Sequence, residues 1–220
     1  MTKQASPILA VVFDFDGVVL ESADVKTDAF VELFAHHGHD IAEQVRAHHL
    51  ANLGISRFVK FAWIYENLLR QPLSEADSAR LGQAFSDLAL AKILEAPFVP
   101  GADRALAQLA PRLPLFVASG TPQGELDHIV DARGLRPHFR EVWGTPTEKP
   151  TILRDLMARH GWTAEQVLFI GDGMSDFKAA SAVGTAFLAR DTPALHADWT
   201  RLGVRMRPDL TDLSEVVASW

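Results

Sequence analysis

The chain has 220 residues, of which 48% are hydrophobic and 22% are charged, and its formal net charge at pH 7 is −7. This composition is typical of a folded protein, and the negative charge disfavours a nucleic-acid partner, because phosphate backbones are bound by clustered Lys and Arg. The absence of cysteine excludes disulfides, thiolate metal sites and cysteine nucleophiles. No apolar run is long enough to cross a bilayer, and residues 1–7 lack the apolar segment of a signal peptide. We therefore expect a cytoplasmic protein with no membrane partner.

The first predicted element is a strand over residues 8–15 that runs into two carboxylates, Asp14 and Asp16, before Gly17 breaks the regular structure. Side chains at i and i+2 leave a strand on the same side, and ligands bind at the carboxyl ends of parallel strands. Two acids so close repel each other unless a cation lies between them or one holds a proton. The pattern therefore predicts a divalent metal at this strand end.

Residues 21–97 are predicted to be helical. Apolar residues recur at helical spacing in three segments, which are Val25 to Phe34, Phe58 to Leu69, and a helix that begins at Ser74 and continues through Leu88. A stretch of this length without a convincing strand is far longer than an ordinary connection between a strand and its helix. We expect an inserted helical domain, which ends before about residue 98.

From Pro100 onward, predicted strands and helices alternate. The expected strands are residues 115–118, 139–143, 167–170, 186–189 and 204–206, with helices that begin near Pro122, span 152–157, and occupy 213–217, and with a capping box at Thr163. Such alternation favours an α/β fold with a doubly wound, Rossmann-like parallel sheet. The predicted core is residues 1–20 and 98–220, and the predicted α-helical cap is residues 21–97.

Polar residues follow four of these strands. They are Asp14 and Asp16, Ser119, Lys149, and Asp172 with Asp176. Phosphoryl transfer needs such a set, because it requires a nucleophile, a hydrogen-bond donor, a cation and a metal that offsets repulsion between two anions. Asp14-Phe-Asp16-Gly, Ala118-Ser119-Gly120, Lys149-Pro150 and Gly171-Asp172-Gly-Met-Ser-Asp176 also resemble, in order, the four motifs of the haloacid dehalogenase superfamily. The agreement spans residues 9 to 190, and the helical insertion lies where members with a type-one cap place theirs.

The resemblance implies a role for each motif residue. Asp14 would be the nucleophile that forms an aspartyl-phosphate, and Asp16 would be the general acid and base. Ser119 would donate to a phosphoryl oxygen and Lys149 would neutralise charge. Asp14, the backbone carbonyl of Asp16, and Asp172 would bind Mg²⁺, with Asp176 orienting them or reaching the metal through water. The alternatives from the residues alone are a helix cap at Ser119, an exposed lysine at Lys149, and turn or helix-start acids at Asp172 and Asp176.

The cap carries further candidate residues. Gly54-Ile55-Ser56-Arg57 resembles the cap loop of phosphoglucomutase-like members, so Arg57 would bind a second anionic group of the substrate, and the alternative is an arginine that opens a solvated helix. Lys26 and Gly120 are the other candidate substrate-binding residues. We expect the cap histidines, His36, His37, His39, His48 and His49, to form a solvated face, and Phe58, Phe61, Trp63 and Tyr65 to belong to the cap core.

The sequence favours a Mg²⁺-dependent phosphatase that acts on a small phosphorylated metabolite. A phosphomutase would share every core residue, but the resemblance puts a histidine in the first cap helix of those enzymes, where this chain has Lys26. A receiver-like phosphoacceptor is the alternative from another class, and it would lack both the cap and the last motif. A catalytically silent homologue is disfavoured because no motif residue is missing. The substrate and the oligomeric state stay open.

Overall fold

The computed structural model describes residues 7–220, so Met1 to Ser6, on which the expectation about a signal peptide rests, lie outside the described residues. Within this range six parallel strands form one sheet in the order β3-β2-β1-β4-β5-β6. The strands are β1 (Ala10–Phe13), β2 (Leu115–Pro122), β3 (Glu141–Thr145), β4 (Val167–Gly171), β5 (Ala186–Arg190) and β6 (Met206–Arg207). Strands β2 and β3 extend the sheet on one side of β1, and β4, β5 and β6 extend it on the other side, which confirms the predicted doubly wound topology. The switch point between these halves is where ligands bind in such sheets.

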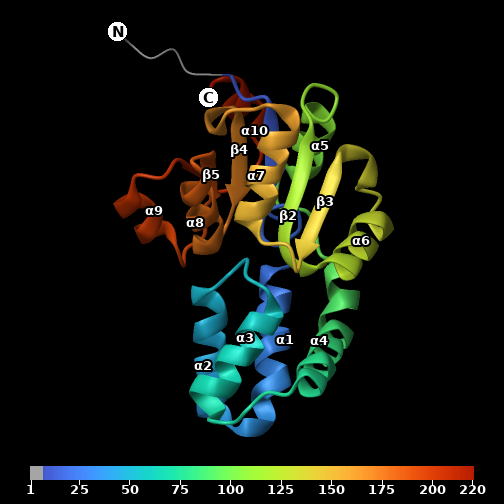
Figure 1. Ribbon diagram of the computed structural model, residues 1–220, viewed down its shortest axis with the longest axis vertical. Helices are drawn as coiled ribbons and strands as arrows, with labels where there is room; N and C mark the ends of the chain where they lie inside the picture. Colours follow the sequence, from blue (N-terminus) through green and yellow to red (C-terminus); the bar gives the residue numbers. More distant parts are fainter. Residues whose placement is uncertain (1–6) are drawn as a thin grey trace.

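Helices cover both faces of the sheet (Figure 1). One face is covered by α5 (Ala102–Leu109), α6 (Gln123–Ala132) and α10 (Leu213–Ala218), and the other by α7 (Lys149–His160), α8 (Met174–Val183) and α9 (His196–Leu202). Alternate residues of β1 serve the two cores, with Val11 and Phe13 in one cluster and Ala10 and Val12 in the other. Both faces are therefore buried, which explains why β1 and β4 are continuous apolar runs.

Several strand boundaries differ from the prediction. The first strand is Ala10–Phe13 rather than residues 8–15, and the last is Met206–Arg207 rather than residues 204–206. The third strand begins at Glu141 rather than at Phe139, which packs edge-on against the ring of Phe13 instead. The second strand extends past Ser119 to Pro122, because Pro122 pairs with β3 beyond an irregularity in the register. Short 3₁₀ turns lie at η1 (Ala35–His37), η3 (Arg136–His138) and η4 (Ala164–Gln166), and the last of these carries the predicted capping box.

The insertion between β1 and β2 forms a helical layer below the carboxyl ends of the strands (Figure 1). It contains α1 (Ala23–Phe34), α2 (His39–Ala51), α3 (Arg57–Ile64), the π-helical turn η2 (Tyr65–Leu69) and α4 (Glu75–Glu95). Ser74 caps α4 as predicted, and its hydroxyl accepts a hydrogen bond from the Asp77 backbone N–H. A bridge joins Leu20 to Phe98, where the chain enters and leaves the insertion. The domain boundaries at residues 20/21 and 97/98 stay a prediction.

Helix α2 was not predicted, and its histidines explain why. Its buried positions are Ala42, Val45 and His49, so a histidine stands where an apolar residue would have completed the pattern. The expected solvated face holds for His36, His37 and His39, which are exposed. It is wrong for His49, which is 3% exposed and lies against the Phe30 ring, and for His48, which is half-buried and stacks on the Trp63 ring.

The aromatic residues of α3 divide between the cap core and the surface. Phe61 is buried between Phe30, Phe34 and Phe85, and Trp63 and Tyr65 pack against this core, as predicted. Phe58 is 39% exposed, so its assignment to the core is wrong. Its ring lies against Gly82 of α4, where a Cβ would come within 2.7 Å of it.

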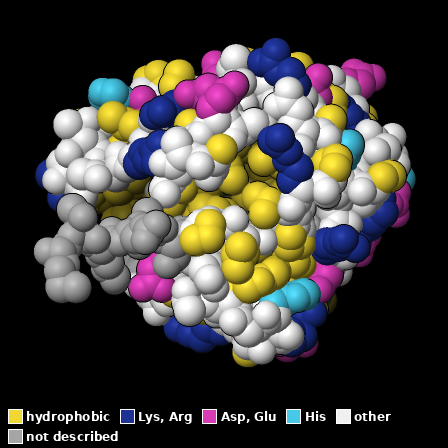
Figure 2. All heavy atoms as spheres, turned by 90° about the horizontal axis from the view of Figure 1, so that it is seen from above, with side chains coloured by type: hydrophobic (Ala, Val, Ile, Leu, Met, Phe, Trp, Pro, Cys, Tyr) yellow, Lys and Arg dark blue, Asp and Glu magenta, His cyan; other side chains and the backbone are white. Residues whose placement is uncertain are grey.

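The face opposite the cap has hydrophobic side chains in a central hollow, with basic and acidic side chains interspersed around it (Figure 2). No single sign of charge dominates this view. In residues 7–220, every helix is too short or too polar to span a bilayer.

Candidate active site

Three buried carboxylates meet where β1 and β4 end. Phe13 lies opposite Ile170 in the sheet, and the backbone N–H of Asp14 donates to the carbonyl of Ile170, so the residues that follow these two strands are neighbours. Oxygens of Asp14, Asp172 and Asp176 all lie within 4.8 Å of one another, and each of these residues is at most 2% exposed. The structure thus brings three predicted residues together.

Lys149, at the start of α7, supplies the cation of this cluster. Its Nζ lies 3.1 Å from Asp14 Oδ1 and 2.5 Å from Asp176 Oδ1, so the exposed-lysine alternative is wrong. Burial raises the pKa of Asp14 to about 7 although Lys149 acts to lower it, and burial and the Asp14 charge raise the pKa of Asp172 well above its usual range. One ammonium therefore does not balance three buried carboxylates.

A divalent cation fits this carboxylate cluster. Its donors are all oxygens, which hard cations such as Mg²⁺ prefer, and its excess negative charge favours a cation. The backbone at Gly17 lies against Asp172, since a Cβ at Gly17 would stand 2.1 Å from Asp172 Oδ2. Gly17 also has a φ of +76°, so both close approach and left-handed backbone require glycine there.

The Asp16 carboxylate does not join this cluster. It accepts hydrogen bonds from Ser22 Oγ at 2.6 Å and Thr121 Oγ1 at 2.9 Å, and it forms an ion pair with Lys26. Burial acts to raise its pKa, but Lys26 and the two hydroxyls hold that pKa below its usual range. The prediction that Asp14 and Asp16 face one cation assumed that the strand includes both residues. The strand ends at Phe13, so the i, i+2 alternation of side chains does not extend to Asp16. The predicted role of the Asp16 backbone carbonyl as a metal ligand stays a prediction.

Ser119 and Gly120 lie at the end of β2, next to β1. Ser119 is 1% exposed, and its Oγ accepts a hydrogen bond from the Thr121 backbone N–H at 3.1 Å, which leaves its own proton available for donation. It does not cap α6, whose N-cap is Pro122. Thr121 was missed by the sequence reasoning, although its Oγ1 also accepts from Lys26 Nζ at 2.6 Å. The available signal was its place in the same polar run as Ser119.

The cap loop of residues 53–55 lies over Asp14 and Lys149. The carbonyl of Leu53 accepts a hydrogen bond from Ser175 Oγ at 2.5 Å. A Cβ at Gly54 would lie 2.9 Å from Lys149 Nζ and 3.4 Å from Asp14 Oδ2, and a Cβ at Gly120 would lie 2.6 Å from the Gly54 carbonyl oxygen. The loop backbone thus fills the space directly in front of Asp14.

Arg57 is buried and already has an acidic partner. It is 5% exposed, and its guanidinium donates to Glu125 of α6 at 2.5 Å and to Ser86 Oγ of α4 at 2.8 Å. The alternative of a solvated arginine is therefore wrong. Glu125, which Ser86 also contacts, neutralises the positive charge of Arg57. We predicted that this charge would bind an anionic group of the substrate, so the substrate-binding role of Arg57 stays a prediction.

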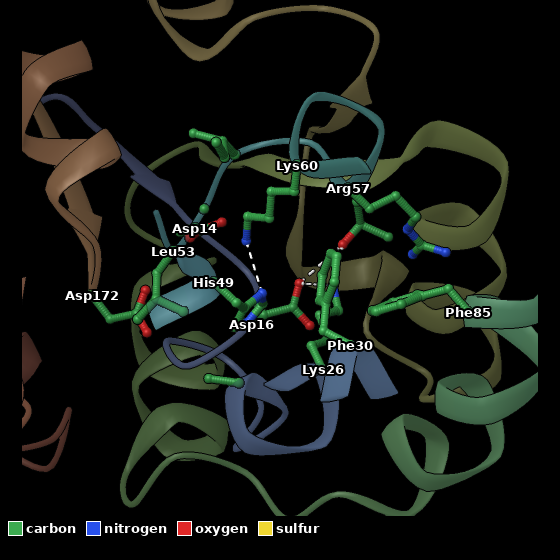
Figure 3. A pocket seen from close by; sticks show the side chains of 15 residues that line it. Asp14, Asp16, Lys26, Phe30, His49, Leu53, Arg57, Lys60, Phe85 and Asp172 are labelled. Atoms are coloured by element: carbon green, nitrogen blue, oxygen red, sulfur yellow. Dashed lines mark hydrogen bonds and ion pairs between the residues drawn. The ribbon is translucent and has the colours of Figure 1, made fainter. Parts of the chain in front are cut away.

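A cavity of ≈ 40 Å³ lies between the cap and the carboxyl ends of the strands. Lys60 and His49 line it from the cap together with Asp14 and Asp16, and Figure 3 shows the contact between Lys60 and His49. Sequence reasoning missed both residues. Lys60 is 3% exposed, although a lysine in the run from Arg57 to Ile64 is normally expected to face solvent. The available signal was its spacing of four from Ile64, which is also buried.

A family model described as haloacid dehalogenase-like hydrolase matches residues 8–184. The chain is 28% identical over 183 residues to the phosphoglycolate phosphatase of Rhodospirillum rubrum, covering 80% of this chain and 76% of that protein. It is 29% identical over 187 residues to the phosphoglycolate phosphatase of Synechococcus elongatus, covering 82% of each.

Solved structures share the fold. A predicted phosphoglycolate phosphatase from Haemophilus somnus has a TM-score of 0.71 at 19% identity, over 97% of this chain and 99% of that chain. The beta-phosphoglucomutase of Clostridium difficile has a TM-score of 0.75 at 17% identity, over 94% and 93%. CbbY from Rhodobacter sphaeroides in complex with xylulose-1,5-bisphosphate has a TM-score of 0.74 at 17% identity, over 94% and 96%.

Proposed function

We propose that this chain, which belongs to the haloacid dehalogenase-like hydrolase family, hydrolyses a small phosphate monoester through an aspartyl-phosphate at Asp14. The predicted enzyme class, a phosphoric monoester hydrolase, is confirmed by the family match and by the phosphatases among its relatives. The observation that carries the proposal is the position of Asp14, which is buried at the switch point beside Lys149 and two further carboxylates.

The metal in the proposed reaction is Mg²⁺, which Asp14, Asp172, Asp176 and the backbone carbonyl of Asp16 would hold. When bound, it would offset the repulsion between the phosphoryl group and the carboxylates. These residues fit such an ion because their buried oxygens carry more negative charge than Lys149 balances.

In the first step, an oxygen of Asp14 attacks phosphorus and the ester P–O bond breaks. The leaving alcohol oxygen takes a proton from Asp16, while Lys149 and the Ser119 hydroxyl stabilise the phosphoryl oxygens. Lys149 is placed to hold Asp14 ionised against the effect of burial, since its Nζ lies 3.1 Å from Asp14 Oδ1.

In the second step, water attacks phosphorus, the bond to Asp14 breaks, and Asp16 takes the proton of the water. The donors around Asp16 hold it ionised, which suits this role as a base, and it has to take up a proton before it can act as the acid of the first step. The proton that Asp16 takes from water is the one that it donates to the leaving alcohol in the next turnover, so protons are conserved over the cycle. Because the cap loop fills the space before Asp14, substrate enters after the cap has moved away.

The substrate class that we propose is a small acid phosphate such as 2-phosphoglycolate, since phosphoglycolate phosphatases are the relatives that match most of the chain. The mutase alternative is disfavoured because Lys26, in the first cap helix, is ion-paired with Asp16 where the resemblance puts a histidine in mutases.

The test is phosphate release from 2-phosphoglycolate and a panel of sugar phosphates, with and without Mg²⁺. We expect metal-dependent release by the native protein and by a control, Asp103→Asn, which changes an exposed acid of α5, and a loss of at least about a thousandfold in Asp14→Asn. Isomerised sugar phosphate would favour the mutase instead. No turnover, together with stable phosphorylation of Asp14 by a small phosphodonor, would refute the proposal in favour of a receiver-like role.

A further inference from the structure

Lys60 of α3 has a buried amino group whose hydrogen-bonding partner carries no charge. Its Nζ lies 3.0 Å from His49 Nδ1 and 5.3 Å from the centre of the Phe30 ring. Among the described residues, no carboxylate lies within ion-pair distance of it. Burying an unpaired charge is costly, and an anionic ligand bound beside such a group would compensate its charge.

His49 adds a second donor without a partner. A protonated Lys60 can only donate, so His49 Nδ1 then accepts and the proton of the neutral ring lies on Nε2. Nε2 is buried and has no hydrogen-bond partner within residues 7–220. Burial, followed by the Lys60 charge, lowers the pKa of His49 to about 2, so the ring is neutral at neutral pH.

The other cations around the cavity differ from Lys60, because each already has an acidic partner. Lys26 is paired with Asp16, Arg57 with Glu125, and Lys149 with Asp14 and Asp176. Within the described chain, Lys60 is therefore the cavity-lining cation whose charge no carboxylate contacts.

The position of Lys60 and His49 relates them to the substrate. Both line the same cavity as Asp14 and Asp16, and both belong to the cap, so they face the part of a substrate that lies beyond its phosphate (Figure 3). Phe30 and Phe85 line the cavity beside them, so a group bound there is shielded from water and its charge-assisted hydrogen bonds are strong.

We propose that Lys60, together with His49, binds a second anionic group of the substrate and so makes the enzyme selective for phosphate monoesters that also carry a carboxylate or another phosphate. This inference rests on the proposed phosphatase function. It assigns to Lys60 the role that the sequence suggested for Arg57, whose charge is taken up by Glu125.

The test compares kcat/KM for three esters that share a two-carbon chain, namely 2-phosphoglycolate, ethylene glycol bisphosphate and ethyl phosphate. Ethyl phosphate lacks the second anionic group, and the other two distinguish a carboxylate from a phosphate. We expect the native protein to prefer one of the anionic esters by at least about tenfold. Lys60→Met should lower that preference by about tenfold to a hundredfold, and Lys60→Arg should retain part of it. The control is Lys92→Met, an exposed lysine of α4, which should keep the native preference.

A binding measurement gives a readout besides turnover. In an Asp14→Asn background, adding Lys60→Met should weaken calorimetric binding of the preferred anionic ester more than that of ethyl phosphate. Equal losses for all esters would show that Lys60 only supports the cap and would overturn the inference. A native protein without preference for either anionic ester would overturn it too, with the phosphatase function intact. Failure to release phosphate from any ester would instead refute the proposed function.

Discussion

Replacing Lys60 by Met is expected to make the protein more stable at neutral pH. Methionine has a similar length and fills the space between His49 and the Phe30 ring without a charge. The substitution also leaves His49 Nδ1 without its donor, which costs about 1–3 kcal/mol at any pH. The pH dependence of the effect therefore isolates the charge of Lys60 from its hydrogen bond.

The magnitude follows from proton linkage. Burial lowers the pKa of Lys60 from 10.5 to about 7, with Lys26 acting in the same direction and Asp16 against it. Lys149 and Asp172 are the other charged groups that act on Lys60, and neither changes in the variant. Between pH 7 and 10.5 the unfolded chain holds this proton and the folded chain does not, so the stability of the native protein rises with pH. The contribution amounts to about 5 kcal/mol in total, of which about 2.5 kcal/mol falls between pH 6 and 9.

The assay is urea unfolding of the native protein and Lys60→Met in EDTA, at intervals from pH 6 to pH 9. The free energy of unfolding of the variant minus that of the native protein should decrease by about 2.5 kcal/mol across this range. Asp14, whose pKa is about 7, titrates within the range, but it is present in both proteins and its effect cancels to first order. A difference that stays constant with pH, or grows, would refute the view that Lys60 is an uncompensated buried cation.

Three further predictions concern the metal, the cap loop and the link between cap and core. Mg²⁺ should raise the Tm of the native protein but not that of Asp172→Asn. In EDTA, Asp172→Asn should need more urea to unfold than the native protein, because one of the buried like charges is gone. An equal rise in Tm for both proteins would contradict the proposed ligand set. Gly54→Ala should lower kcat/KM at least about tenfold, because the new Cβ would meet Lys149 and Ser175. The control is Gly38→Ala, which should only lose stability, because Gly38 has a φ of +100° but no atom within 4 Å of the new Cβ. Equal effects of the two substitutions on kcat/KM would count against the loop contact. In urea unfolding of Arg57→Met, Glu125→Gln and the double variant, the coupling energy should reach about 1–3 kcal/mol, and additive effects would show that the ion pair is not a link.

The sequence predicted the elements whose signals are local. Apolar runs that end in polar residues located β1, β2 and β4, and the topology of a doubly wound sheet brought Asp14, Ser119 and Asp172 to one edge. Ser74 and Thr163 marked helix starts because their caps involve residues three positions along the chain.

The features that it did not predict depend on partners distant in the chain. Glu125 neutralises Arg57 from 68 positions away, and nothing near Arg57 in the sequence signals this. Lys26 forms an ion pair with the Asp16 carboxylate, which was not predicted because it depends on how the backbone turns after the strand ends at Phe13. Likewise, the burial of Lys60 follows from the packing of α3 against α2, whose apolar pattern His49 interrupts.

In the proposed reaction, the contact of the cap loop with Asp14 would affect the rate of turnover. Polar contacts hold the cap on the core, among them Ser175 with the Leu53 carbonyl, Arg57 and Ser86 with Glu125, and Lys26 with Asp16 and Thr121. In the proposed reaction these contacts would separate before substrate enters or phosphate leaves, and Arg57–Glu125 and Lys26–Asp16 are ion pairs. The frequency of this opening would then set an upper limit on kcat that is independent of the chemical steps. While the loop is down, it would also limit the access of bulk water to the proposed phosphorylated Asp14.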